Sequence, residues 1–463
     1  GTAAHCELIG RSTENPAVGI KLALPHQEHW NGKLFFRGGG GLDGVFPPLL
    51  GSAGFFAGHA LNKGYVVAAT DSGHKAGPAG VFDATWALNA PDKEDLFGFA
   101  AVDISVRAAK RLSEALYGSR PKRSYFMGCS NGGRQALMQA GRYPENFDGI
   151  VSVAPVWDAL AGVLPRYATL QQRQADPSSA LTSANADLLQ AEVLRQCDTL
   201  DGAADGLVVA AGQCNAIFQR STLACGNNNG APGCFAAGQM ETLGWLLDGP
   251  RTGPGQVVSA GFPVSGAEAS PAALATWMIG GPGAPSGQRL FADGLSKYLA
   301  FRPDDITYGF DRYSVDTDIG RSATMRAILD APTDVNAFLR RGGKLLMASG
   351  WSDYAVSARS TIEYHDKARA NAGPLASNIS LFLAPGVQHC AGGPGPDSVD
   401  LLTPLEQWVE ASQAPAQVIA NPDDLEQIAS EEEKANVAAL SGWRKELFGD
   451  TALKLINGEV ALR

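Results

Sequence analysis

The sequence has no long apolar run and no basic run, and these two absences exclude whole classes of protein. No uninterrupted apolar segment approaches the roughly 18 residues that span a bilayer, so we expect no membrane partner. Lysine and arginine number 37 against 47 aspartate and glutamate residues, which gives a formal net charge of −10. Nucleic-acid binding relies on clustered basic side chains, so no nucleic-acid partner is expected either.

Cysteine occurs seven times, but no two cysteines form a C-x-x-C pair with the spacing of a zinc site. The pairs Cys197–Cys214 and Cys225–Cys234 are close in sequence and favour disulfides that close loops. Disulfides persist in oxidising compartments, so we expect a secreted or periplasmic protein. Seven is an odd number, and we expect Cys6 to be left without a partner.

The most informative segment is Gly128-Cys129-Ser130-Asn131-Gly132, which fits the nucleophile-elbow pattern G-x-S-x-G. A β-type run precedes it and a helix-type run follows it. Small neighbours leave room for a serine on a strained strand-to-helix turn. An ordinary glycine-rich turn would match as well, so this pattern alone leaves both interpretations open.

Two residues far downstream favour the interpretation of Ser130 as a nucleophile. Asp353 and His389 each follow a β-type run, and the chain order Ser, Asp, His is that of α/β-hydrolases. A serine hydroxyl needs a histidine to accept its proton and a carboxylate to orient that histidine. We therefore predict Ser130 as nucleophile, His389 as base and Asp353 as the residue that orients the base.

Apolar patterning predicts the fold class. β-type runs alternate with helical spacing, which is typical of an α/β fold with the active residues at the carboxyl ends of the strands. The predicted strands are 34–37, 65–70, 125–127, 149–154, 344–348 and 379–384, with a helix from 99 to a stop at 118. The alternation of β-type runs with helical spacing stops near residue 155 and returns at 344. This indicates a large inserted lid domain on an α/β-hydrolase core. The expected division is core at 1–154 and 342–420, lid at 155–341, and a helical C-terminal tail at 421–463.

The glycine run at 38–41 follows an early strand, where α/β-hydrolases place half of the oxyanion hole. We predict that the backbone N–H groups of Asn131 and Gly41 stabilise the oxyanion, with Gly40 nearly as suitable as Gly41. A flexible turn is the alternative interpretation of the run.

Cys129 precedes the predicted nucleophile, and Cys390 follows the predicted base. If nucleophile and base lie within hydrogen-bond reach, these cysteines are close enough for a disulfide, which needs Cα atoms about 4.4–6.8 Å apart. Two unrelated buried thiols are the alternative, but the double adjacency favours the bridge.

Residues 197–207 carry three aspartates interleaved with glycines. Hard oxygen donors on a tight loop suit Ca²⁺. The composition alone fits an acidic turn in solvent better.

The Cys-Ser and His-Cys pairs, with the G-x-S-D segment at 350–353, resemble the tannase and feruloyl esterase family from about residue 31 to about residue 420. The resemblance implies that a disulfide joins the two pairs and that the lid binds one structural Ca²⁺. The implied calcium ligands are the side chains of Asp198, Asp201 and Asp205 and the carbonyl groups of Ala203 and Leu207.

The resemblance also places Arg289 where a family member holds the free carboxylate of its substrate, a group that an arginine fork suits. The alternative is a lid-surface arginine with an ordinary ion pair. Trp277, Phe291 and Tyr298 either line an aromatic pocket or belong to the lid core.

The tail departs from the family. A partner for the first cysteine and a cysteine-paired C-terminal tail are not visible, and residues 423–463 look like part of the HRDC helical module of RNase D. Only part of such a module is present, so we infer no nucleic-acid function from it.

These features predict a monomeric serine carboxylic-ester hydrolase with a small aromatic ester as substrate. Esters of feruloyl or hydroxycinnamoyl, galloyl and terephthalate monoester type are expected to be cleaved through an acyl-enzyme. One alternative is a hydrolase specific for mono(2-hydroxyethyl) terephthalate. Another is a binding protein that keeps the fold without activity, although such proteins usually lose a triad member.

Overall fold

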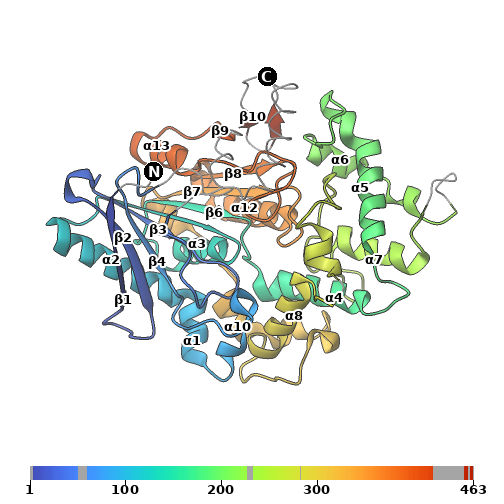
Figure 1. Ribbon diagram of the computed structural model, residues 1–463, viewed down its shortest axis with the longest axis horizontal. Coiled ribbons are helices and arrows are strands. Elements are labelled where there is room, and N and C mark those ends of the chain that lie inside the picture. The colour runs from blue at the N-terminus through green and yellow to red at the C-terminus, as the bar shows by residue number, and fades with distance from the viewer. Residues whose placement is uncertain are drawn as a thin grey trace.

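The computed structural model describes residues 4–50, 60–226, 233–281, 283–420, 453–456 and 459–461. Its centre is an eight-stranded sheet with the strand order β1-β2-β4-β3-β5-β6-β7-β8 (Figure 1). The strands are β1 (His5–Arg11), β2 (Gly19–Pro25), β3 (Lys33–Arg37), β4 (Val66–Thr70), β5 (Arg123–Cys129), β6 (Gly149–Val153), β7 (Lys344–Gly350) and β8 (Ile379–Ala384).

The sheet is mixed. β1 and β2 are antiparallel to each other, and β2 is antiparallel to β4, whereas all neighbours from β4 to β8 are parallel. The strands predicted from the apolar runs are confirmed as β3 to β8. The sequence reasoning did not predict β1 and β2, which lie at the edge; β1 carries a more polar pattern than the central strands.

Both faces of the parallel part are covered, which explains why its strands are apolar throughout. Side chains alternate between the faces, so Phe36 and Phe126 belong to one buried cluster and Phe35 and Tyr125 to another. The helices of the core are α1 (Pro91–Asp95), α2 (Ala101–Tyr117), α3 (Asn131–Arg142), α12 (Ala358–Ala372) and α13 (Leu402–Ala411). The predicted helix is α2, and it ends at Gly118 in the left-handed conformation with φ 77°.

The chain between β6 and β7 is helical. Its helices are α4 (Leu164–Gln174), α5 (Ser183–Cys197), α6 (Ala211–Ile217), α7 (Ala237–Asp248), α8 (Gly287–Tyr298), α9 (Asp318–Arg321), α10 (Ala323–Leu329) and α11 (Asn336–Arg340). Figure 1 shows α5, α6 and α7 at the opposite end of the molecule from β1 and β2. The fold is thus the predicted α/β-hydrolase core with a large inserted domain, while the predicted boundaries at 154, 341 and 420 stay predictions.

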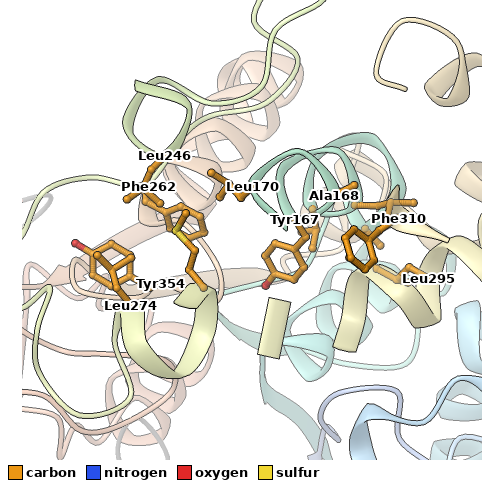
Figure 2. Packing of buried hydrophobic residues seen from close by; sticks show 14 of the residues in the cluster. Tyr167, Ala168, Leu170, Leu246, Phe262, Leu274, Leu295, Phe310 and Tyr354 are labelled. Atoms are coloured by element: carbon orange, nitrogen blue, oxygen red, sulfur yellow. The ribbon is translucent and has the colours of Figure 1, made fainter. Parts of the chain in front are cut away.

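Most of one buried hydrophobic cluster comes from the insertion. Figure 2 shows Tyr167 and Leu170 of α4 in this cluster with Leu246 of α7 and Leu295 of α8. Tyr354, which follows β7, belongs to the same buried cluster. The insertion is therefore packed against the loop that carries the predicted acid.

The prediction of a helical tail is wrong where the tail is described. β9 (Gln417–Ala420), β10 (Leu453–Ile456) and β11 (Glu459–Ala461) form an antiparallel sheet with the order β11-β10-β9. Between β10 and β11 the sequence is Asn457-Gly458, and Asn-Gly between apolar runs is a strong hairpin signal that outweighs the helical composition around it. The rest of 421–463 lies outside the described residues.

Within the described ranges, no helix combines the length and the apolar character that crossing a membrane requires.

Candidate active site

Ser130 occupies a strained turn between β5 and α3. Its backbone has φ 62° and ψ −122°, a region that residues with a side chain rarely adopt. Gly132 is needed just after it, because a Cβ atom there would lie 2.5 Å from the carbonyl oxygen of Gly39. The local sequence therefore holds Ser130 at the end of β5, where it lines a pocket.

Asp353 and His389 are brought together from the loops after β7 and β8. The Asp353 side chain is fully buried, and its Oδ2 lies 2.7 Å from His389 Nδ1. Its Oδ1 accepts the backbone N–H groups of Ala355 and Val356, each at 2.8 Å. With the Nδ1 proton donated to Asp353, Nε2 remains available for a serine hydroxyl.

The inserted domain helps to fix this acid loop. The Tyr354 hydroxyl donates to Glu268 Oε1 at 3.0 Å, and its ring lies 5.7 Å from that of Phe262 (Figure 2). From α4, the Tyr167 hydroxyl donates to the carbonyl oxygen of Ala355 at 2.6 Å. The position of Asp353 thus depends on contacts with the insertion as well as on β7.

All three predicted disulfides form. Cys129 and Cys390 are joined with a Cα–Cα distance of 5.9 Å, and this bond ties the residue before Ser130 to the residue after His389. The other two bonds are Cys197–Cys214 and Cys225–Cys234. Cys6 is free and exposed, as expected.

Ser130 and His389 line one pocket. Its other lining residues are mostly apolar, as is usual for pockets that bind small molecules. No hydrogen bond joins Ser130 to His389 among the described residues, and such contacts often tighten only when substrate binds. The other lining residues are Gly41, Leu42, Phe97, Asn131, Arg134, Val156, Ala159, Val163, Tyr167, Trp277, Phe291, Leu295, Leu329, Ala355 and Val356.

Two of the three aromatic candidates line this pocket. The Trp277 ring meets the His389 ring edge to face, with the centroids 5.2 Å apart, and Phe291 lies nearly parallel to Trp277 at 6.5 Å. Tyr298 packs against the core of the insertion and is not among the lining residues. Trp277 and Phe291 also touch that core, so both interpretations of these two residues hold.

The predicted oxyanion donors lie at the same pocket. Asn131 is the first residue of α3, where a backbone N–H has no partner within the helix. Gly41 has φ 55°, and a Cβ atom there would lie 2.4 Å from the carbonyl oxygen of Val81. The neighbouring N–H groups of Leu42 and Asp43 donate to the carbonyl oxygens of Val81 and Gly40, whereas that of Gly41 donates to no backbone carbonyl among the described residues. Gly41 lines the pocket and Gly40 does not, which favours Gly41.

Sequence reasoning missed a buried polar cluster behind these donors. Asp43, Ser72, Arg134 and Gln135 are each at most 3% exposed and hydrogen-bond to one another or to Asn131. The available signal was the polar pair Arg134-Gln135 just before the apolar residues Ala136, Leu137 and Met138 of the helix-type run. That signal does not reveal the partners, which come from other elements.

Arg289 is not brought to the pocket. It lies on α8 with an exposed side chain, its guanidinium is 5.4 Å from the centre of the Phe310 ring, and its backbone N–H donates to Ser286 Oγ. It is not among the lining residues. A role in holding a carboxylate stays a prediction.

The aspartates of the predicted calcium loop each accept backbone N–H groups from the loop or from the residues just after it. Asp198 accepts from Gly206, Asp201 from Ala203 and Val209, and Asp205 from Leu207. Burial raises the pKa of Asp205, and the nearby charges of Asp201 and Asp198 add to this effect. The oxygen donors suit Ca²⁺, but no three acidic, histidine or cysteine side chains in the described ranges are arranged to hold a metal ion.

The chain is similar to known esterases over nearly its whole length. The model of the family described as tannase and feruloyl esterase matches residues 6–443, beyond the predicted range of 31–420 at both ends. Mono(2-hydroxyethyl) terephthalate hydrolase of Piscinibacter sakaiensis is 30% identical over 90% of this chain and 78% of its own. A probable feruloyl esterase of Arthroderma benhamiae is 30% identical over 89% of this chain and 76% of its own.

Solved structures show the same fold. Feruloyl esterase B from Aspergillus oryzae superposes with a TM-score of 0.77 at 23% identity, covering 90% of this chain and 84% of the other. Tannin acyl hydrolase from Aspergillus niger gives 0.69 at 21% identity, covering 87% and 77%. With the family model matched along the chain and a relative at 30% identity, this protein belongs to the tannase and feruloyl esterase family and is a carboxylic ester hydrolase.

Proposed function

We propose that the protein hydrolyses esters of aromatic carboxylic acids through an acyl-enzyme on Ser130. One observation carries the proposal: an apolar pocket with Trp277 and Phe291 in its wall contains both Ser130 and the histidine of the His389–Asp353 pair. Relatives named for feruloyl and terephthalate esters support the aromatic acyl group.

The geometry suits a two-step acyl transfer. His389 accepts the proton of Ser130 through Nε2 while the serine oxygen attacks the ester carbonyl, and Asp353 stabilises the resulting imidazolium. The N–H groups of Asn131 and Gly41 stabilise the tetrahedral oxyanion. His389 then returns the proton to the leaving alcohol, and water hydrolyses the acyl-enzyme by the same steps.

A substrate panel tests the proposal. We expect kcat/KM for methyl ferulate, chlorogenic acid, a galloyl ester or mono(2-hydroxyethyl) terephthalate to exceed that for an aliphatic methyl ester at least about tenfold, because each apolar group buried in a fitting pocket contributes to binding. A fluorophosphonate should add mass at Ser130 alone. Arg289→Ala should impair only the substrates with a free carboxylate, which are chlorogenic acid and mono(2-hydroxyethyl) terephthalate. Equal rates for aliphatic and aromatic esters, or no adduct at Ser130 in folded protein, would contradict the proposal.

We further propose that Asp198, Asp201 and Asp205, with the carbonyl groups of Ala203 and Leu207, bind one structural Ca²⁺. The oxygen-rich donor set and the mutual repulsion of the carboxylates support the proposal, because a cation would relieve that repulsion. In the described structure the three carboxylates are not arranged to hold an ion, so binding must draw them together. No catalytic step depends on this ion.

Chelation is expected to lower the melting temperature. A ligand at 100 times its Kd stabilises the native state by about 2.7 kcal/mol, and EGTA removes that contribution. Ca²⁺ in excess, but not Mg²⁺, should restore the melting temperature. In Asp205→Asn, neither EGTA nor Ca²⁺ should change the melting temperature. Asp187→Asn on α5, an exposed aspartate outside the loop, is the matched control. An unchanged melt in EGTA would count against the site.

The three disulfides support a secreted or periplasmic location, because such bonds persist in oxidising compartments. We propose that the protein acts there as a monomer.

A further inference from the structure

Asp43 is a buried carboxylate in the loop that follows the glycine run. It is 1% exposed and adopts φ 41°. Its Oδ1 accepts a hydrogen bond from Asn131 Nδ2 at 2.6 Å, and its Oδ2 accepts from Gln135 Nε2 at 2.6 Å and from the Ser72 hydroxyl. The carboxylate therefore joins the loop after β3, the loop after β4 and the first turn of α3.

Both proposed oxyanion donors belong to segments that this cluster holds. Asn131 supplies one donor through its backbone, and its side chain is fixed between Asp43 and Arg134, whose Nε donates to Asn131 Oδ1 at 2.7 Å. On the other side, Gln135 Oε1 accepts the N–H of Gly39 at 3.0 Å. A Cβ atom on Gly39 would lie 2.7 Å from Asp43 Oδ2, so the backbone of the glycine run packs directly against the carboxylate at this residue.

The cluster is anchored at its far end by Arg134. Its guanidinium donates to the carbonyl oxygens of Gly98 at 2.8 Å and Phe97 at 2.9 Å. Arg134 is 1% exposed, so these bonds fix the side chain inside the protein. Asn131 therefore has one fixed partner on each side of its amide.

Three groups converge on Asp43: the NH₂ groups of Asn131 and Gln135 and the Ser72 hydroxyl. The two amides are fixed as donors, because their oxygens accept from Arg134 and Gly39. An ionised carboxylate can accept from all three groups. Burial raises the pKa of Asp43 to about 6, so the fold disfavours its charged form. At neutral pH, where the group is charged, this burial cost lowers the stability of the fold.

We propose that Asp43 is a positioning residue that pre-organises the oxyanion hole by fixing Asn131 and, through Gln135, the glycine run. The inference rests on the proposed roles of Ser130, Asn131 and Gly41. Oxyanion donors are effective because they are already in place when charge develops. A misplacement of about 1 Å can lower a rate about 10²-fold.

Asp43→Asn tests the proposal, because the introduced amide replaces one carboxylate oxygen by an NH₂ group, which then faces the NH₂ group of either Asn131 or Gln135. We expect kcat to fall about 10²-fold with KM nearly unchanged. An aryl trifluoromethyl ketone, which forms an oxyanion on the serine, should lose affinity by the same factor as kcat/KM, whereas the product acid should bind as before. Asp318→Asn is the matched control: Asp318 is fully buried, accepts hydrogen bonds from Tyr308, Ser314 and Arg321, and lies outside the cluster. It should leave the ratio of ketone to product-acid affinity unchanged.

A second substitution restores the pattern. When Asp43→Asn is combined with Gln135→Glu, the carboxylate introduced at position 135 accepts the N–H of Gly39 and the amide NH₂ introduced at position 43. The amide oxygen at position 43 then accepts from Asn131. We expect the double variant to recover kcat at least about tenfold over Asp43→Asn, although Gln135→Glu alone lowers kcat by setting two carboxylates together. If Asp43→Asn does not fold, Gln135→Met, which removes the link to Gly39 and leaves Asp43 in place, should lower kcat and ketone affinity together about tenfold.

Wild-type kcat and ketone affinity in Asp43→Asn would overturn the inference, as would a double variant no better than Asp43→Asn. In either case aromatic-ester turnover and the fluorophosphonate adduct at Ser130 in the wild type would leave the proposed function standing. Absence of turnover and adduct in the wild type would instead contradict the proposed function itself.

Discussion

Asp353→Asn is expected to lower kcat about 10⁴-fold while changing KM by no more than a few fold. The two N–H groups of Ala355 and Val356 hold one side-chain oxygen of residue 353 at 2.8 Å each. They will orient the asparagine so that its oxygen stays with them and its NH₂ group faces His389 Nδ1. His389 must then accept at Nδ1 and carry its proton on Nε2, so it can no longer take the proton of Ser130.

Steady-state kinetics on the best substrate of the panel measure this effect, and the rate of fluorophosphonate labelling should fall with kcat. Asp71→Asn is the matched control, because Asp71 also follows a strand, is buried and accepts two backbone N–H groups, those of Gly19 and Gly73. It is not among the residues that line the pocket and should keep kcat within about threefold of wild type. A kcat for Asp353→Asn close to that of the wild type would show that His389 does not depend on Asp353.

The fold and the Ser130, Asp353, His389 arrangement were predictable because their signals are local. β3 to β8 are apolar runs, and each predicted active residue follows one of them in the chain. Parallel strands place their carboxyl ends at one edge of the sheet, so sequence position implies spatial proximity. The Cys129–Cys390 bond followed from the same logic, since each cysteine adjoins one of these residues.

The Asp43 cluster was not predictable, and the aromatic pocket wall could be given only as one of two alternatives, because the contacts of these residues are set by tertiary packing. Asp43 and Gln135 are 92 residues apart, and no sequence pattern around either residue indicates the other as its partner. Trp277 lies in the insertion, where no strand edge fixes the position of a side chain relative to His389. The pairing of β10 with β11 was missed for a different reason: the stretch has a charged, helix-type composition, and its hairpin signal is the single dipeptide Asn457-Gly458.

Removing the Cys129–Cys390 bond by the double substitution to serine is expected to reduce both activity and stability. The bond closes a segment with a sequence separation of 261, and loop-closure entropy for so long a loop corresponds to a loss on the order of 5 kcal/mol, an upper value for such bonds. Activity should fall more steeply than the folded fraction, because the bond fixes the backbone on both sides of the Ser130 and His389 pair.

The second measurement separates these two effects. Titration with a mild reductant, followed by activity, near-UV circular dichroism and thiol mapping, should show activity falling before the fold is lost. Cys225→Ser with Cys234→Ser is the control, because that bond has a separation of only 9 and lies in the insertion away from the pocket-lining residues. The control should keep kcat near wild type. Free thiols at Cys129 and Cys390 in fully active enzyme would show that the elbow and the base loop hold their positions without the bond. The Asp353–His389 hydrogen bond, with the contacts of Tyr354 and the insertion, would then have to position His389.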